Sequence, residues 1–482
     1  MIFERLSGSL LVATLLFAAP VSAQSSAGSA RSSAPRPNIV YIVADDLGWK
    51  DVGFHGSDIR TPAIDRLAQG GARLEQFYAQ PMCTPSRAAL MTGRYPHRYG
   101  LQTLVIPSAG TYGVATDERL LPQALKDAGY RTAIVGKWHL GHADRKYWPR
   151  QRGFDYQYGP LLGEIDYFTH SAHGTRDWFR DNEPVREEGY VTQLLGRDAV
   201  KLIENHDPKT PLFLYLAFTA PHAPYQAPQE YLDRYASIAD PSRRAYAAMI
   251  TAMDDEIGRV LAALEKRGMR ENTLIVFQSD NGGPRSAKFT GEIDMSKSTI
   301  PADNGPYRDG KGTLYEGGTR VAALVNWPGH IPSAAVEGPI HIVDMYPTLA
   351  GLAGASVAAN KPLDGVDLWP ALSDGKPSPR EEVIYDIEPF RSALRVGDWK
   401  LVWQATLPSR VELFDLKADP GEKNNLAEKN PAKVAELQQR IQELAREAVP
   451  PLIFTDALGA VKPALFGSVT FPSEEKAVEE QP

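Results

Sequence analysis

Four short apolar runs, rich in β-branched and aromatic residues, recur along the chain, and polar residues follow each of them. The runs cover residues 38–44, 130–135, 212–217 and 273–277. Apolar runs of this length without polar alternation are typical of strands buried on both faces of a parallel sheet. Helices are predicted between the runs, over residues 61–68, 120–128 and 244–268. Strands that alternate with helices predict an α/β fold with a largely parallel sheet.

The polar residues just beyond these strands are candidates for chemistry. They are Asp45 and Asp46, Lys137 and His139, His222, and Asp280 and Asn281. Because the carboxyl ends of parallel strands meet at one edge of a sheet, we expect one shared site there. Solvent exposure of Lys137 and a structural role for His139 remain the alternative for either residue alone.

The oxygen-bearing members of this group indicate a metal site. Adjacent carboxylates such as Asp45 and Asp46 repel each other unless a cation lies between them. Asp280 and Asn281 add further oxygen ligands, which suit a hard cation such as Ca²⁺ or Mg²⁺ better than zinc. A solvated Asp-Asp turn is the alternative.

The chain changes character near residue 376. Short antiparallel strands are predicted over 383–385, 392–396 and 400–403, followed by an amphipathic helix over 431–447. We therefore expect a catalytic domain at 38–375, a smaller α+β domain at 376–471 and a disordered tail at 472–482. The long stretch 282–306 has no clear period and is predicted to overhang the site as a lid. Within the helix 244–268, Asp254 and Asp255 are interpreted as surface charge.

The amino terminus and the composition indicate an exported enzyme. Residues 1–23 carry an apolar run and end in Val21-Ser22-Ala23, the pattern of a signal peptide, and 24–37 is expected to be a disordered leader. No later stretch is long enough to span a membrane. A net charge of −7 without long charged runs argues against nucleic acid as a partner. Without any Asn-x-Ser/Thr acceptor, a secreted or periplasmic bacterial enzyme is expected.

Cys83, the single cysteine of the chain, stands in the segment Cys83-Thr84-Pro85-Ser86-Arg87. Pro85 suits a first helical turn and Gly93 can end the helix, so Cys83 is expected at a helix N-terminus. Free backbone N–H groups at such an end favour an anion. The alternative is a small buried apolar side chain, which is how most free cysteines behave.

Several motifs resemble those of one enzyme family. Cys83-x-Pro85-Ser86-Arg87, continued by Leu90-x-Thr92-Gly93-Arg94, and the segment 136–141 (Gly-Lys-Trp-His-Leu-Gly) are similar to the two motifs of type I, formylglycine-dependent sulfatases in the alkaline phosphatase superfamily. Segments 310–318 and 412–426 extend the resemblance, which is nearest to arylsulfatase B-type enzymes. It implies a large, mostly parallel sheet flanked by helices, with a smaller C-terminal domain that has a short antiparallel sheet and a helix.

The resemblance also implies a cofactor and a metal. A formylglycine-generating enzyme would convert Cys83 to formylglycine (3-oxoalanine). One Ca²⁺, or Mg²⁺ in its place, would be held by five residues, namely Asp45, Asp46, Cys83, Asp280 and Asn281.

Roles in the reaction follow from the same resemblance. The hydrated formylglycine at position 83 would attack the sulfur of a sulfate ester with help from Asp280. His222, assisted by Lys311, would protonate the leaving alcohol, and His139 would accept a proton as sulfate leaves. Arg87 and Lys137 would position the nucleophile, and Lys137 and Lys311 would hold sulfate oxygens. The alternatives are a phosphate or phosphonate ester hydrolase of the same superfamily and an inactive, calcium-stabilised binding protein.

The expected substrate is a terminal sulfated sugar, with aryl sulfates as incidental substrates. The segment 161–170 resembles a loop of arylsulfatase B-type enzymes, in which Asp166 and His170 would bind sugar hydroxyls. Trp148, Trp178 and the stretch 282–306 would complete the pocket wall. The alternative is a structural loop with its aromatic residues simply packed.

Overall fold

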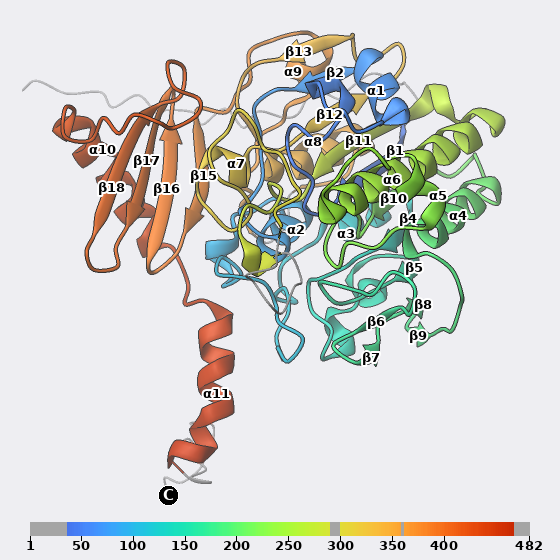
Figure 1. The fold of residues 1–482 in the computed structure, drawn as a ribbon, viewed down its shortest axis with the longest axis horizontal. Helices are drawn as coiled ribbons and strands as arrows, with labels where there is room; N and C mark the ends of the chain where they lie inside the picture. The colour runs from blue at the N-terminus through green and yellow to red at the C-terminus, as the bar shows by residue number, and fades with distance from the viewer. Residues whose placement is uncertain (1–35, 290–298, 358–360, 467–482) are drawn as a thin grey trace, which may run out of the picture. The chain divides into compact units, whose positions relative to one another are not determined.

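The computed structural model describes residues 36–289, 299–357 and 361–466, and in this part of the chain ten strands form the central sheet (Figure 1). Their order is β13-β2-β12-β11-β1-β10-β4-β5-β8-β9. The bounds are β1 Asn38–Ala44, β2 Ala72–Leu74, β4 Arg131–Gly136, β5 Tyr156–Gly159, β8 Phe179–Arg180, β9 Glu183–Pro184, β10 Leu212–Ala217, β11 Thr273–Ser279, β12 Ala323–Asn326 and β13 Ala334–Val336. The five central strands β11-β1-β10-β4-β5 run parallel to one another.

Helices cover both faces of this sheet, as the alternation along β1 shows. Ile39, Tyr41 and Val43 belong to one core cluster, and Val40 and Ile42 belong to the other. The first cluster is shared with α2 Cys83–Thr92, α3 Leu121–Asp127 and α8 Met345–Ala353. The second is shared with α1 Pro62–Gln69, α4 Val191–Glu204 and α6 Pro241–Lys266. Burial on both faces explains why the strand sequences are continuously apolar.

A second sheet stands apart from the first (Figure 1). Its four strands, β15 Glu382–Ile387, β16 Arg391–Val396, β17 Trp399–Gln404 and β18 Arg410–Asp415, are antiparallel in sequence order. The helix α10 Pro431–Arg446 buries Leu437, Ile441 and Leu444. The fold class expected from the sequence, a mostly parallel sheet with a smaller C-terminal α+β part, is confirmed.

The remaining elements are short, except the last helix. They are β3 Phe77–Tyr78 paired with β14 Ile340–His341, the hairpin β6 Ser171–Ala172 with β7 Thr175–Arg176, the helices α5 Gln229–Asp233, α7 Glu316–Thr319 and α9 Trp369–Ser373, and the longer α11 Leu452–Phe466. The sequence reasoning did not predict α11. No helix of the described residues combines the length and the apolar character needed to cross a membrane.

One residue of α6 corrects a prediction. Asp254 is buried rather than at the surface, and its carboxylate accepts hydrogen bonds from the backbone N–H groups of Ala63 and Ile64 at 3.0 and 2.8 Å. It therefore satisfies the free N–H groups at the start of α1, whose N-cap Thr61 makes no side-chain capping bond. The 3.6-residue pattern of α6 could not reveal this, because the partner lies 190 residues away in sequence.

Three predicted segments lie wholly or partly outside the described residues. They are the signal peptide 1–23, the leader 24–37 apart from its last two residues, and the tail 472–482. Residues 290–298, within the predicted lid 282–306, are also outside. The domain boundary at 375/376 stays a prediction.

Candidate active site

The strand ends of the central sheet deliver their polar residues to one place. Asp45 and Asp46 follow β1, Lys137 follows β4, and Asp280 and Asn281 follow β11. All five are at most 1% exposed. They lie together because β11, β1, β10 and β4 are parallel neighbours, so their carboxyl ends share an edge.

The helix α2 brings Cys83 to the same place. It begins at Cys83, as expected, and ends at Thr92, just before Gly93, whose φ of 67° is the left-handed conformation that glycine tolerates. The sulfur of Cys83 lies 3.5 Å from Asp45 Oδ1. One turn on, Arg87 donates through Nε and Nη2 to Asp280 Oδ2 at 3.0 and 2.8 Å.

Each carboxylate of the cluster has its own cation. Lys137 Nζ lies 2.6 Å from Asp45 Oδ2, and Lys311 Nζ lies 2.7 Å from Asp46 Oδ2. Burial alone would favour the neutral acids, but the pKa of Asp45 is lowered by Lys137 and that of Asp46 by Lys311, with His222 adding to both. The pKa of Asp280 is raised by burial and by the charge of Asp45.

The thiol of Cys83 is a poor nucleophile in this setting. Burial raises the pKa of Cys83, and the negative charge of Asp280 raises it further against the opposing effect of Lys137. Since the thiolate is the reactive form of cysteine, the unmodified side chain is held in its unreactive state.

The residues present fit a hard cation. Asp45, Asp46, Cys83 and His222 each offer an atom within 4.8 Å of the others. The amide oxygen of buried Asn281 has no hydrogen-bond partner among the described residues, although its nitrogen donates to Asp46 Oδ1 at 2.8 Å. A buried oxygen without a partner among carboxylates is suited to a metal ligand. Asp280, also predicted as a ligand, is outside the group of four.

Two histidines face the cluster in different states. His139 is buried, its Nε2 lies 3.1 Å from the carbonyl oxygen of Ile106, and its Nδ1 has no partner. Burial, with the charges of Lys137 and Arg87, lowers the pKa of His139 well below its usual value, so its ring is neutral. His222 is partly exposed, with Nε2 3.6 Å from Asp46 Oδ2 and Nδ1 2.6 Å from the carbonyl oxygen of Ala223.

A cavity of about 310 Å³ adjoins these groups. Cys83, His139, His222 and Lys311 line it together with apolar side chains from several loops. Its other polar lining residues are Ser108, Glu164, His173 and Lys288. Phe289 also lines it, with the ammonium groups of Lys288 and Lys311 at 4.6 and 5.3 Å from the ring centre.

The structure places the residues predicted to bind the sugar outside the lining of this cavity. His170 is fully buried, its Nε2 lies 2.8 Å from the carbonyl oxygen of Gly189, and its ring packs beside buried Trp178. Asp166 accepts bonds from the backbone of its own loop and from Gln226. None of these three residues lines the cavity, and neither does Trp148, which packs on Phe179.

Glu164 and His173 line the cavity instead, and sequence reasoning missed both as site residues. Their half-exposed side chains are in contact, with His173 Nε2 3.2 Å from Glu164 Oε1. His173 and Gly174 form the tight turn between β6 and β7, with φ of 47° and 79°. The His-Gly dipeptide was a usable turn signal, but its place beside the cavity depends on tertiary packing.

Comparison with known proteins identifies the family. The profile described as "Sulfatase" matches residues 37–355, which is most of the chain. The chain belongs to the sulfatase family. A second profile, "N-sulphoglucosamine sulphohydrolase, C-terminal", matches residues 307–447. The family expected from the motifs is therefore confirmed, and the sulfatase is a sulfuric ester hydrolase.

Curated relatives and solved structures agree with this assignment. Arylsulfatase J of Mus musculus is 36% identical, over 90% of this chain and 79% of that protein. N-acetylgalactosamine-6-sulfatase of Homo sapiens is 35% identical, over 72% of this chain and 68% of that protein. The structure of Ps i-CgsB in complex with k-i-k-neocarrahexaose matches with a TM-score of 0.78 and 34% identity, covering 89% of this chain and 100% of that one.

Proposed function

We infer that this sulfatase removes a sulfate ester from a sulfated sugar, with formylglycine at position 83 and one divalent cation, Ca²⁺ or Mg²⁺. The observation that carries the proposal is the cavity beside Cys83, whose lining combines the ammonium groups of Lys288 and Lys311 with apolar and hydrogen-bonding groups. The similar proteins support a sugar, since N-acetylgalactosamine-6-sulfatase and the structure of Ps i-CgsB in complex with k-i-k-neocarrahexaose are among them. Sites of this mixed character suit sugars, which have apolar faces and hydroxyl edges.

The cations of the site would hold the sulfate group. Lys137 and Lys311 are buried and pair with carboxylates that a metal would also neutralise. When bound, a divalent cation would be held by Asp45, Asp46, Asn281 and position 83, with His222 close by, and would supply positive charge for the sulfate oxygens. Fixed positive groups in a water-poor site stabilise charge that develops in the transition state.

Position 83 would carry the nucleophile after modification. Formylglycine supplies a hydrated aldehyde, whose hydroxyl is a nucleophile that the protonated thiol is not. Arg87, one helical turn away, holds Asp280 so that this carboxylate faces position 83. Asp280 would accept the proton of that hydroxyl.

The two histidines would move the remaining protons. His222 lines the cavity and is the group placed to give a proton to the leaving alcohol, with Lys311 beside it on Asp46. His139 is neutral, and its free Nδ1 can accept a proton during release of sulfate.

Glu164 and His173 would recognise the sugar. Both line the cavity, and as an exposed pair they can exchange their mutual contact for hydrogen bonds to sugar hydroxyls. Phe289 offers an aromatic face for the sugar ring. A volume of about 310 Å³ is near the lower end of ligand sites, so one terminal sugar is the expected occupant.

The test is a sulfate-release screen against defined sulfated mono- and oligosaccharides. The protein is produced with a formylglycine-generating enzyme, and the mass of the Cys83 peptide is checked first. Release from a terminal sulfated sugar supports the proposal. Release from aryl sulfates alone, or faster cleavage of aryl phosphates than of any sulfate ester, would contradict it.

The proposal includes export of the enzyme. A signal peptide at residues 1–23 would direct it outside the cytoplasm, where sulfated polysaccharides are found. The amino-terminal residue of the secreted protein is the direct measurement, and Gln24 is the expected result.

A further inference from the structure

Lys311 reaches the active site from the segment 308–320, and this segment packs against the C-terminal sheet. Residues Leu314 and Tyr315 belong to a separate apolar cluster with Tyr78 and six residues of the C-terminal region. Those six are Val383, Tyr385, Ala393, Val402, Phe414 and Leu416. The profile of the C-terminal region also begins at residue 307, before Lys311.

Polar contacts hold both ends of this segment. Before Lys311, Arg308 Nη1 donates to Glu412 Oε1 at 3.2 Å, and after it Tyr315 donates to the same carboxylate. Next to Lys311, the carbonyl oxygen of Gly312 accepts a hydrogen bond from Arg391 of β16. The segment is thus bonded to the C-terminal sheet on either side of the lysine that would bind sulfate.

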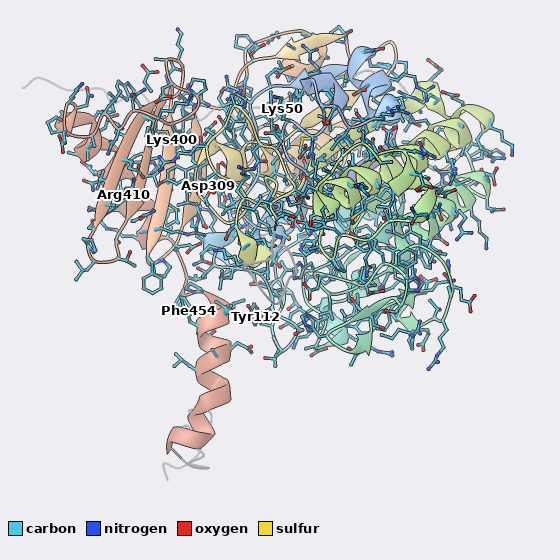
Figure 2. All side chains as sticks on the ribbon, viewed as in Figure 1. Lys50, Tyr112, Asp309, Lys400, Arg410 and Phe454 are labelled. Carbon is cyan, nitrogen blue, oxygen red and sulfur yellow. The ribbon has the colours of Figure 1, made fainter. Side chains whose placement is uncertain are left out.

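A further contact between the segment and the C-terminal sheet is made by Lys400 and is fully buried. Lys400 stands on β17, in the C-terminal sheet (Figure 2). Its Nζ donates to Glu316 Oε1 at 2.9 Å and forms an ion pair with Glu422 Oε1 at 2.8 Å. All three side chains are fully buried. Glu422 Oε2 in turn accepts from the backbone N–H of Glu316 at 2.6 Å.

A buried charge of this kind is costly to leave unpaired. Burial favours the neutral form of Glu316, yet Lys400 and Arg320 lower its pKa to about 2, whereas burial and the charge of Glu316 raise the pKa of Glu422 to about 7. Removing the lysine would leave two buried carboxyl groups facing each other, with the guanidinium of Arg320, 3.6 Å from Glu316 Oε2, as the cation that remains beside Glu316. Protonation of Glu422 would relieve part of this repulsion. Glu316 would still lose its contact with β17, and the segment that carries Lys311 would lose one of its anchors.

We propose that Lys400 is a positioning residue for sulfate ester hydrolysis, which holds Glu316 and thereby sets where the Lys311 ammonium stands. This inference rests on the proposed role of Lys311 in binding sulfate. It makes the C-terminal sheet part of the catalytic machinery rather than an appended domain. A displacement of about 1 Å at a reacting centre can cost on the order of 100-fold in rate.

The first measurement is hydrogen exchange on the full chain carrying Lys400→Met, which keeps the side-chain length and removes the charge. Backbone amides of residues 308–320 should exchange faster, while those of β1 and β11 stay unchanged. The matched control is Arg440→Met, which breaks an ion pair with Glu382 in the same C-terminal part without touching the segment. Unchanged exchange over 308–320 in Lys400→Met would overturn the proposal.

The second measurement is a double-mutant cycle with an aryl sulfate. Lys400→Met should lower kcat/KM about 10- to 100-fold in the wild type, but less than about threefold in a Lys311→Ala background, because it acts through Lys311. Equal losses in both backgrounds would mean a general structural role and would overturn the proposal. Arg440→Met should change kcat/KM less than about twofold in either background.

Misfolding of Lys400→Met and a lack of activity in the wild type can both be told apart from failure of the proposal. If Lys400→Met does not fold, Glu422→Gln takes its place, because glutamine keeps an acceptor for the Glu316 amide and removes only the charge. It should give the same pattern with smaller losses, and additive losses would again overturn the proposal. If the wild type releases sulfate from no ester, the proposed function fails, and the exchange contrast still decides whether Lys400 holds the segment.

Discussion

Asp45 and Asp280 enter the active site directly from the ends of β1 and β11, whereas Lys311 enters it from a segment that packs on the C-terminal sheet. The parallel-sheet side of the site, which carries Asp45 and Asp280, needs only the register of neighbouring strands to bring its carboxylates together, such as Ile42 beside Phe277. The second side depends on contacts between residues that are about 80 to 110 positions apart, such as Lys400 with Glu316 and Arg308 with Glu422.

This difference predicts how each side of the site should respond to substitution. Residues at the ends of central strands are surrounded by fully buried backbone, so a substitution there removes chemistry and leaves the position of its neighbours intact. The Lys311 segment is bonded to the parallel-sheet side through backbone contacts such as Lys311 N to the carbonyl oxygen of Gly283 at 3.1 Å. It also depends on polar contacts and one small apolar cluster with the C-terminal sheet. There, a distant substitution can move a catalytic group without removing it.

The largest effect is expected on the parallel-sheet side, at Cys83. Cys83→Ala removes the only atom that can become the nucleophile, so kcat should fall by at least about three orders of magnitude. Its unfolding midpoint should stay close to that of the wild type, because one buried sulfur is lost. Steady-state kinetics and thermal unfolding check both values. Wild-type activity in a preparation whose Cys83 remains a free thiol would contradict the prediction.

Removal of the metal should come next. Chelation should abolish turnover, and added Ca²⁺ or Mg²⁺ should restore it. A cation that binds only the folded state adds about 2.7 kcal/mol at 100 times its dissociation constant, so the unfolding midpoint should rise with cation concentration. Asp45→Asn with Asp280→Asn should remove that rise. Lys311→Ala serves as the control, since it leaves the carboxylates in place and should keep a cation-dependent midpoint.

Substrate selectivity should change by a smaller factor. Glu164→Gln and His173→Ala should lower kcat/KM for a sulfated sugar about 10-fold, because each loses a hydrogen bond of about 1–2 kcal/mol, and should leave a small aryl sulfate unaffected. His170→Ala is the contrast, because its buried ring packs in the fold. It should lower the unfolding midpoint and affect both substrates equally. A selective sugar defect in His170→Ala would revive the role that its sequence position suggested.

The smallest effect concerns pH and the helix behind the parallel sheet. Burial raises the pKa of Glu256 in α6 to about 7, and its Oε2 has no partner. The folded state therefore binds this proton more tightly than the unfolded state. The resulting stabilisation is complete below about pH 4.5 and is lost as pH rises through about 7. Glu256→Gln should remove about 1–3 kcal/mol of this pH dependence, measured by denaturant unfolding between pH 5 and 8.

Glu422→Gln gives the matching measurement on the C-terminal side, because the pKa of Glu422 is also raised to about 7. The two variants should flatten the pH dependence of stability in the same direction. Only Glu422→Gln should also change kcat/KM, because Glu422 contacts the segment that carries Lys311. Equal kinetic effects of both variants would remove the contrast between the two sides.

Much of the first side was predictable without coordinates. The apolar runs at 38–44 and 212–217 coincide with β1 and β10, because a strand buried on both faces must be apolar at every position. The motif around Cys83 predicted the start of α2, since Pro85 and Gly93 are local signals. Strand order then places the polar ends together.

Other features required the tertiary structure. The sequence predicts Asp254 as a surface charge of α6, but its carboxylate caps another helix. It predicts His170 as a ligand of the sugar, but the ring is buried against Trp178. Glu164 and His173 reach the cavity through loop packing that has no period in the sequence. Local patterns report the backbone conformation of neighbours, whereas the partner of a polar side chain is chosen by elements that fold against it from far along the chain. Lys400 is the clearest case. The alternating pattern of its strand does not predict that its side chain is buried and pairs with Glu316.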